Sequence, residues 1–291
     1  MKSVPGTRGF WARLGLTALN LALVVIAGGF AAAALVRYSP GFDVDENTWN
    51  PRIGAATEEA MHAARRRENA LPRFYVNYLR AALHGDFGES DSLKAPVAEL
   101  LGERAPVTMR LIGFGTAGGM ALGALLAWIA VWPRGAAGPM FGVTTSGLLL
   151  AIPPAVLGLY FFFEEAPLWI AVALAVAPRV FGTARAVLAD LHGSPALVAA
   201  RARGVGPARL AVRYVAGAAL PQWIALFGVT VVLAFGSIIP IEALCDVPGI
   251  GQLAWKAALA RDLPLLCGLA LIITFAVACA QSLGELAGWE R

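Results

Sequence analysis

The sequence predicts an all-α, polytopic helical integral membrane protein with about six transmembrane helices. Three observations support this prediction. Of 291 residues, 58% are hydrophobic and only 14% are charged, whereas soluble domains carry about 25% charged residues. The apolar residues form uninterrupted runs of about 20 or more residues, long enough to cross roughly 30 Å of hydrocarbon as a helix. Basic residues lie between these runs, as the positive-inside rule requires of membrane proteins.

The first apolar run follows Lys2, Arg8 and Arg13, as it would in a signal peptide. It is longer than the roughly 7–15 residues of a signal-peptide core, so we expect a retained signal anchor. Because backbone groups in lipid must be hydrogen-bonded internally, every run is expected to be helical. The six expected spans are 14–36, 107–132, 140–163, 169–188, 222–244 and 264–286.

Two of the spans contain proline. Pro153 and Pro154 are expected to kink the third span. Pro178 and Arg179 interrupt the fourth span, which is the weakest of the apolar runs. A charged residue within a membrane is by default a functional candidate. The structural alternative is that the Arg179 side chain extends to the cytoplasmic headgroups.

Gly115, Gly119 and Gly123 recur every four residues in the second span. This spacing allows two helices to approach closely, so we expect a packing role in preference to a moving gate.

The distribution of charge in the loops predicts the orientation of the chain. The N-terminal tail has three basic residues and no acid, and the connection around 189–221 is rich in arginine. Glu164 and Glu165 lie on the opposite side. Both termini are therefore expected in the cytoplasm. The chain then divides into a cytoplasmic tail with the first helix (1–36), an external loop or subdomain (37–106) and a five-helix core (107–291).

Several classes of function are disfavoured. Basic and aromatic residues do not alternate as they do in proteins that bind nucleic acid, despite a net charge of +4. Cys245, Cys267 and Cys279 form no CxxC pair and are expected to be inert thiols. All three histidines lie outside the spans, and no Ser/His or paired-carboxylate set is available inside the membrane. We therefore expect no catalytic residue and no metal site.

The connection SPALVAARARGVGPARLAVRYVAGAALP, residues 194–221, carries the first specific signal. Ser194 supplies an N-cap oxygen and Pro195 needs no hydrogen-bond donor, so a helix is expected to start there. Gly204 and Gly206 are expected to end it, and Pro207 to begin a second helix. Taken alone, this loop could also be an ordinary juxtamembrane amphipathic segment.

The AARARG…LP pattern of this loop resembles the cytoplasmic loop of binding-protein-dependent ABC importer permeases. In that family a short coupling helix docks in a cleft of the ATP-binding subunit. Val198 stands where the family often has Glu, so no ionic contact is expected there. The residues that the resemblance assigns to contact with the ATP-binding subunit are Ala199, Ala200, Arg201, Arg203 and Gly204.

A second segment resembles the external segment before the last helix of the dipeptide/oligopeptide permeases. Its glycines permit backbone angles that are closed to other residues, and Arg261-Asp262 is expected to cap or pair locally. The matching residues are Glu242, Pro248, Gly249, Gly251, Arg261, Asp262, Pro264 and Gly268.

Two further stretches resemble the same family. One is the GDFGES…PV…RAP.T stretch that runs from Gly85 to Thr108, and the other is Ala151-Ile152-Pro153-Pro154 with Gly158. The resemblances follow the family order from Tyr78 to Leu286. Three regions depart from the family: 40–69, the short loop 164–167 and the tail after 286.

The resemblance implies a type I ABC importer permease fold and a transmembrane subunit that forms the pathway of an ATP-driven importer, most simply for peptides, although relatives also carry nickel. It implies a second permease, two ATP-binding subunits and an external solute-binding protein as partners, in the inner membrane of a bacterium. The sequence has no GxxxxGK[ST] motif, so ATP and Mg are expected on the partner subunit and no cofactor in this chain. An ion-coupled secondary carrier and a non-transporting scaffold remain as alternatives.

Overall fold

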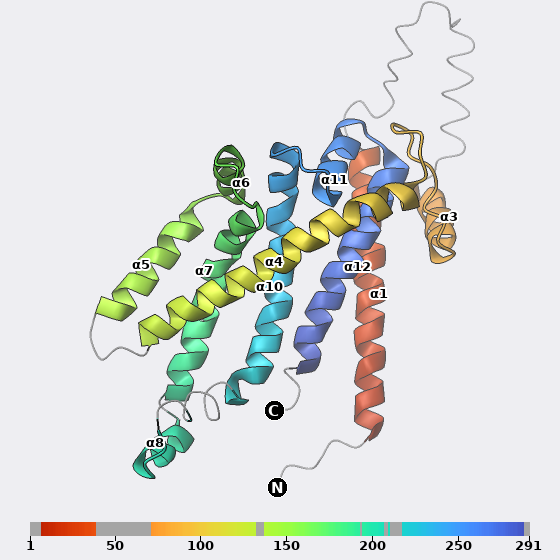
Figure 1. Cartoon of the computed structure of the whole chain (residues 1–291). Coiled ribbons are helices and arrows are strands. Elements are labelled where there is room, and N and C mark those ends of the chain that lie inside the picture. Colours follow the sequence, from red (N-terminus) through yellow and green to blue (C-terminus); the bar gives the residue numbers. More distant parts are fainter. Residues whose placement is uncertain are drawn as a thin grey trace, which may run out of the picture. The chain divides into compact units, whose positions relative to one another are not determined.

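The computed structural model describes residues 7–38, 71–131, 137–192, 194–206, 209 and 217–287. Every helix or strand assigned within these residues is an α-helix, which confirms the predicted all-α class (Figure 1). They are α1 (Thr7–Arg37), α3 (Leu71–Leu83), α4 (Val97–Val131), α5 (Ala137–Ala151), α6 (Pro154–Phe163), α7 (Trp169–His192), α8 (Pro195–Ala202), α10 (Gly217–Leu244), α11 (Ile250–Leu259) and α12 (Leu263–Ala287).

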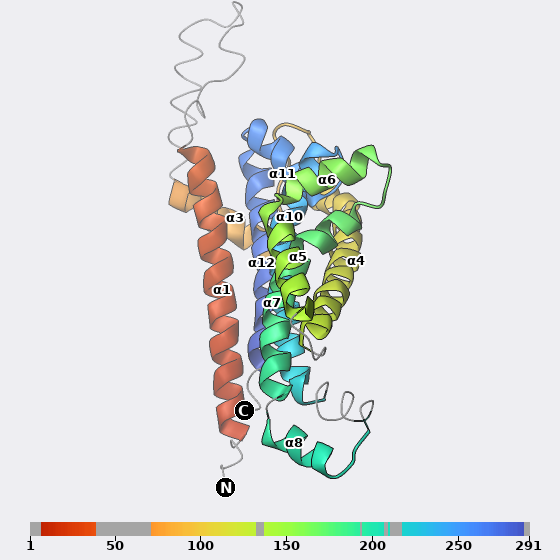
Figure 2. The same cartoon turned by 90° about the vertical axis from the view of Figure 1, so that its left-hand side faces the viewer.

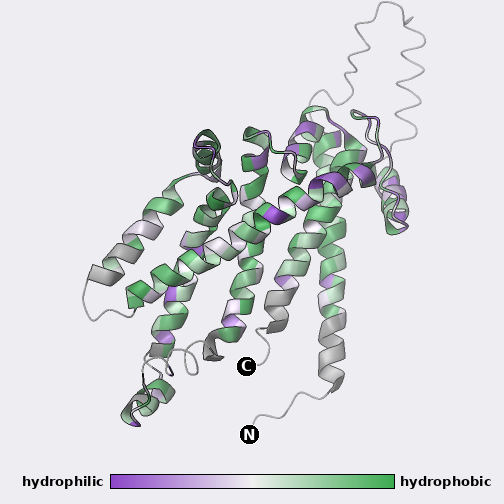
Figure 3. Cartoon of the chain, viewed as in Figure 1, coloured by the Kyte–Doolittle hydropathy of each residue, from purple (hydrophilic) through white to green (hydrophobic). Residues whose placement is uncertain are grey.

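Five of these helices are long and apolar enough to cross a membrane. They correspond to five of the six predicted spans. Figure 3 shows how apolar residues cover them, with α1 apolar along most of its described length. The spanning segments are Gly15–Arg37, Val97–Val131, Trp169–Leu191, Leu220–Leu244 and Leu263–Ser282.

The expected third span is two helices instead of one. The axes of α5 and α6 differ by 86°, and the pair counts as a sixth span only if the bent pair is taken as one. Pro153 lies at the junction in an extended conformation (φ −60°, ψ 140°), and Pro154 is the first residue of α6. The predicted kink is confirmed, but it is a sharp corner because two successive residues lack the N–H that a continuous helix needs.

Two other boundaries differ from the sequence prediction. Helix α4 starts at Val97, ten residues before the expected start at 107, and passes through Pro106. Helix α7 continues through Pro178 and ends at His192. A proline inside a helix removes one backbone hydrogen bond and favours a break. Both α4 and α7 nevertheless continue past their prolines, Pro106 and Pro178.

The chain forms two compact units. The first comprises Met1–Ala105 and Leu253–Phe275, and the second comprises Pro106–Gln252 and Ala276–Arg291. Helices α4, α11 and α12 each contribute residues to both units. The proposed division into tail, external segment and core describes membrane topology, which this partition does not address, and it stays a prediction.

In the first unit, α3 is held between α1 and α12 by two tyrosines. The Tyr75 hydroxyl donates a hydrogen bond to the Ile26 carbonyl oxygen at 2.8 Å, and the Tyr78 hydroxyl donates to the Pro264 carbonyl oxygen at 3.0 Å. Burial raises the pKa of Tyr78, so its hydroxyl stays protonated and able to donate. Helix α3, part of the region expected to form a subdomain after the first span, is therefore anchored by the tyrosine hydroxyls at the ends of otherwise apolar side chains.

The second unit is built on close contact between α4 and α7. Gly119 and Gly123 of α4 face α7, where a Cβ atom at either position would lie 2.8 Å from a backbone carbonyl oxygen, that of Ala173 or Ala177. Gly115 faces Val172 in the same way. The predicted packing role of these glycines is confirmed. Figures 1 and 2 show α5, α6 and α10 around the same α7.

We predict that Gly119→Val destabilises the second unit, because the added side chain must displace the backbone of α7 and cannot be accommodated by a rotamer change. Overpacking of this kind costs about 1–3 kcal/mol. The melting temperature of the purified protein in detergent, followed by tryptophan fluorescence, should fall by several degrees. Gly113→Val on the same helix is the matched control, because a Cβ atom there meets nothing within 4 Å. Equal melting temperatures for the two variants would contradict the packing assignment.

Candidate functional site

Helix α8 begins and ends as its sequence predicts. The Ser194 side-chain oxygen accepts a hydrogen bond from the Leu197 N–H at 3.4 Å, and Pro195 is the first helical residue. At the other end Gly204 adopts a φ of +75°, and the Val205 N–H donates to the Ala200 carbonyl oxygen. These are a serine N-cap and a left-handed glycine C-cap. The second predicted helix of this loop, after Pro207, lies outside the described residues apart from Arg209.

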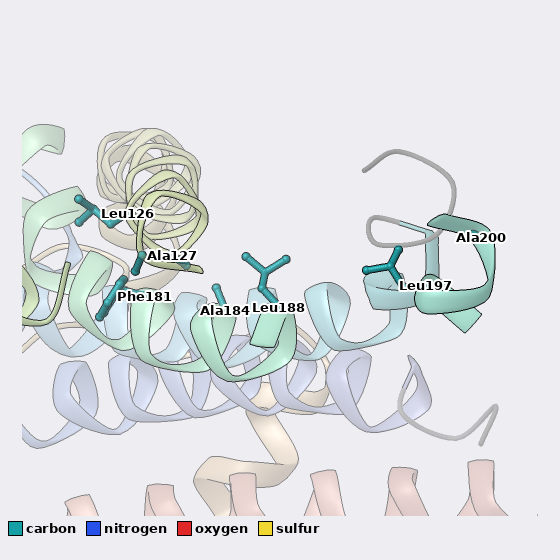
Figure 4. Close-up of a cluster of buried hydrophobic side chains, with 8 residues drawn as sticks. Leu126, Ala127, Phe181, Ala184, Leu188, Leu197 and Ala200 are labelled. Atoms are coloured by element: carbon teal, nitrogen blue, oxygen red, sulfur yellow. The ribbon is translucent and has the colours of Figure 1, made fainter. Parts of the chain in front are cut away.

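One face of α8 packs on the end of the second unit. Leu197 and Ala200 are fully buried in a cluster with residues of α4 and α7, and Figure 4 shows these side chains. The cluster also contains Leu126, Ala127, Ala130, Phe181, Ala184 and Leu188. This apolar contact fixes the orientation of α8 relative to α4 and α7.

The opposite face of α8 is exposed and made of small residues. Val198 is 55% exposed, and Ala199 and Ala202 are also exposed. Arg203 is exposed as well, and its Nε donates to the Ala199 carbonyl oxygen at 3.2 Å, so that it caps the end of the helix. The structure therefore separates the predicted contact residues into two sets.

Ala200 does not belong to the outward-facing set. It was expected at the partner contact beside Ala199, but it is completely buried against the bundle. Adjacent residues on a helix point about 100° apart, so one face cannot present both of them. Ala200 is a packing residue that positions the helix. The side chain of Arg201 lies outside the described part of the chain.

Glu242, near the end of α10, is a fully buried carboxylate. Its two oxygens accept hydrogen bonds from the Thr108 hydroxyl at 2.7 Å and from the Gly251 N–H at 2.6 Å. The Thr108 oxygen in turn accepts from the Ile250 N–H at 2.8 Å. Ile250 and Gly251 are the first residues of α11, whose N–H groups have no partner within their own helix. The carboxylate and the hydroxyl therefore hold the start of α11 against α4 and α10.

The glycines of the same motif make room for this carboxylate. A Cβ atom at Gly249 would collide with the Glu242 carboxylate, and one at Gly251 would lie 2.7 Å from the Ile239 Cα atom. Glycine is needed here for its lack of a side chain, because neither position has a positive φ. Asp246, earlier in the turn, bonds to the Gln252 side chain.

Asp262, before α12, is the second buried carboxylate of the motif. It caps α12 by accepting the Leu265 N–H at 3.1 Å, which confirms the predicted local capping. It also accepts hydrogen bonds from the Ser90 hydroxyl at 2.6 Å, the Ser92 hydroxyl at 2.7 Å and the Ser92 N–H at 2.9 Å. Within the first unit, the family-like stretch around 85–96 is thus joined to the Asp262 end of the second motif.

The hydrogen bonds to Asp262 keep it ionised. Burial alone would raise the pKa of this carboxyl, but the hydrogen bonds from Ser90, Ser92 and the Leu265 N–H hold the pKa below its usual value. A buried carboxylate with four donors is a rigid point of attachment between distant segments.

The sequence located Glu242, Gly249, Gly251 and Asp262 but not what holds them. Thr108 and Ser90 were recognised only as members of a motif, and Ser92 was not singled out. A hydroxyl residue carries no signal of a partner more than 100 residues away, so these bonds could not be read from spacing. Pro248 lies in the turn before α11, and Arg261 has a φ of +54° immediately before the Asp262 cap.

Comparison of the sequence with known protein families identifies the family of this chain. The family described as binding-protein-dependent transport system inner membrane component matches residues 112–286, more than half of the chain. The chain belongs to this family. The matched region contains α8, Glu242 and Asp262.

Three relatives illustrate how the family varies. A provisionally named peptide permease protein of Brucella ovis is 27% identical over 87% of this chain and 89% of its own length. The nickel import system permease protein NikB of Staphylococcus aureus is 23% identical over 92% of this chain and 87% of its own length. A provisionally named peptide permease protein of Brucella suis is 26% identical over 87% of this chain and 89% of its own length.

Membership of the family establishes the general role. The chain is a multi-pass inner membrane protein and the non-catalytic permease subunit of an ABC importer, which works with an ATPase and a binding protein. The alternatives of an ion-coupled carrier and a non-transporting scaffold are set aside by this membership.

We predict that Glu242→Gln destabilises the permease. The Gln side chain keeps one oxygen that can accept a hydrogen bond, but its amide nitrogen cannot accept the other, so either the Thr108 hydroxyl or the Gly251 N–H loses its partner. A buried donor without a partner costs about 1–3 kcal/mol. The expected result is a melting temperature several degrees below wild type. Glu164→Gln, at an exposed carboxylate, is the control and should leave it unchanged. If Glu242→Gln melts with the wild type, the carboxylate does not hold α11.

Proposed function

We propose that this permease pairs with a second permease of the same or similar sequence, and that α8 docks in a cleft of an ATP-binding subunit. The observation that supports this is the two-sided character of α8. Leu197 and Ala200 tie it to the bundle, while Val198, Ala199 and Ala202 present a thin apolar surface to solvent. A short helix with an exposed surface of small apolar side chains suits a groove on a partner, where such side chains allow close approach.

The attachment of α8 suggests how movement would pass into the membrane. Its buried residues share one cluster with residues at the ends of α4 and α7, so a displacement of α8 by the ATP-binding subunit would move these two helices with it. Two ATP-binding subunits would bind and hydrolyse ATP, and the spans would open alternately to the two sides. The permease itself would carry out no covalent chemistry.

The same proposal sets the orientation. The end of the second unit that carries α8 faces the cytoplasm, together with both termini. Helices α7 and α10 lead to the opposite end, where Ile241 packs against Gly158 of α6 and Glu242 holds α11. That end faces outward and receives the solute from an external binding protein.

For the solute we propose peptides, on the resemblance to the dipeptide/oligopeptide class and the similarity to two provisionally named peptide permeases. Nickel is the second candidate, because other relatives of similar identity are named as nickel permeases. In lipid discs that hold the whole importer, peptide-loaded binding protein should stimulate ATP hydrolysis, and nickel salts with the same binding protein should not. The reverse result would assign the nickel role.

Gly204→Val should uncouple the importer. A β-branched residue at a φ of +75° is strained, so the end of α8 must change shape. The cost of roughly 1–2 kcal/mol for a left-handed conformation corresponds to an association with the ATP-binding subunit weakened about 5- to 30-fold. The measurement is solute-stimulated ATPase activity of the co-purified complex in lipid discs.

Gly206→Val is the matched control, because Gly206 lies two residues away, is exposed and has no positive φ. It should leave coupling intact. Normal uptake and stimulated ATPase in Gly204→Val would remove α8 as the docking element.

A further inference from the structure

Arg179 lies near the centre of the part of α7 that is long and apolar enough to cross a membrane. The span runs from Trp169 to Leu191, so at 1.5 Å per residue Arg179 stands about 15 Å from one end and about 18 Å from the other. An arginine side chain is shorter than either distance. Where the bilayer covers the whole of this segment, extension to the headgroups, the structural alternative for this residue, does not bring its charge out of the membrane.

The surroundings of Arg179 change along α7. In the half of the helix before it, Val172, Val176 and Pro178 are all buried. From Arg179 toward α8, one face becomes exposed. Arg179, Gly182, Thr183, Ala186 and Asp190 lie on this face at helical spacing, and Arg185 and Ala189 at its edge are exposed as well. Val180, Phe181, Ala184 and Leu188, on the other side of this half, are buried.

The exposed face of α7 has the wrong chemistry for lipid. It contains small, polar and charged residues, with no large apolar side chain. The exposed residues of α1 show what a lipid-facing surface looks like in this chain, since Leu16, Leu19, Leu23 and Val24 are each at least 50% exposed. Lipid contact would leave an unpaired guanidinium in hydrocarbon, which is costly. Among the described residues, no carboxylate forms an ion pair with Arg179.

We propose that this face of α7 lines the water-filled solute pathway and that the Arg179 guanidinium binds a carboxylate group of the passing solute. The proposal rests on the proposed function, since it assumes a pathway between two permeases. Glycine and alanine beside Arg179 leave room for a solute, and the guanidinium offers a planar pair of donors that matches a carboxylate. A peptide carries such a group at its C-terminus, whereas a nickel cation would be repelled.

The test is thiol labelling of the complete importer in lipid discs. Thr183→Cys places a thiol one turn from Arg179 on the same face. It is treated with 2-sulfonatoethyl methanethiosulfonate, an anion, or 2-(trimethylammonium)ethyl methanethiosulfonate, a cation, and each rate is divided by the rate of that reagent with 2-mercaptoethanol. The wild-type complex gives the background from Cys245, Cys267 and Cys279.

We expect rapid labelling of Thr183→Cys, with a corrected rate about tenfold higher for the anionic reagent because the nearby cation concentrates anions. Adding Arg179→Gln should abolish that preference, and adding Arg179→Lys should keep it. Leu23→Cys, at a comparable depth on the exposed face of α1, is the control and should not be labelled. Trialanine should slow labelling of Thr183→Cys more than trialanine amide, which lacks the carboxylate.

Three results would overturn the proposal. Absence of labelling at Thr183→Cys would mean that lipid or a partner subunit covers this face. An anion preference that survives Arg179→Gln would mean that another group attracts the reagent. Equal protection by trialanine and its amide would mean that the carboxylate is not what Arg179 binds. None of these readouts depends on coupling through α8, so this proposal and the docking assignment can fail separately.

Discussion

The absence of water in the bilayer is the constraint on which the rest of this structure depends. Every backbone N–H and C=O group in hydrocarbon must find a partner inside the protein, and so must every buried polar side chain. The spans are helical for that reason. Burial inside the protein imposes the same requirement on Glu242 and Asp262: a buried carboxylate is tolerated only where hydroxyl and N–H groups replace its water. The polar residues of the chain thus become its points of attachment.

These attachments lie where helices begin. Glu242 and Thr108 accept hydrogen bonds from the first N–H groups of α11. Asp262 accepts one from the start of α12 and others from Ser90 and Ser92. Helix starts carry unpaired donors and a partial positive charge, so a carboxylate satisfies both at once. The family-like motifs of this permease are therefore largely a means of fixing short helices to long ones.

Within the second unit, α7 and α10 connect two ends of different character. At one end α8 is held by apolar packing around Leu197 and Ala200, and at the other Glu242 holds α11 through hydrogen bonds. The glycine contacts of α4 with α7 leave little freedom between these helices. In a permease, such a unit would move as a body, which is what coupling between α8 and the end that holds α11 requires.

The sequence by itself determined the features that depend on neighbours along the chain. These include the apolar spans, the cap at Ser194, the turn at Gly204, the corner at Pro153 and the close-packing glycines of α4. It placed the start of α4 too late and marked Pro178 as an interruption of the weakest span, because proline disfavours a helix locally. Only the tertiary structure decided that Ala200 is buried beside an exposed Ala199, that Ser90 reaches Asp262 across 172 residues, and that Arg179 faces out of a packed helix. Such facts depend on which distant segments come into contact, and local sequence does not encode them.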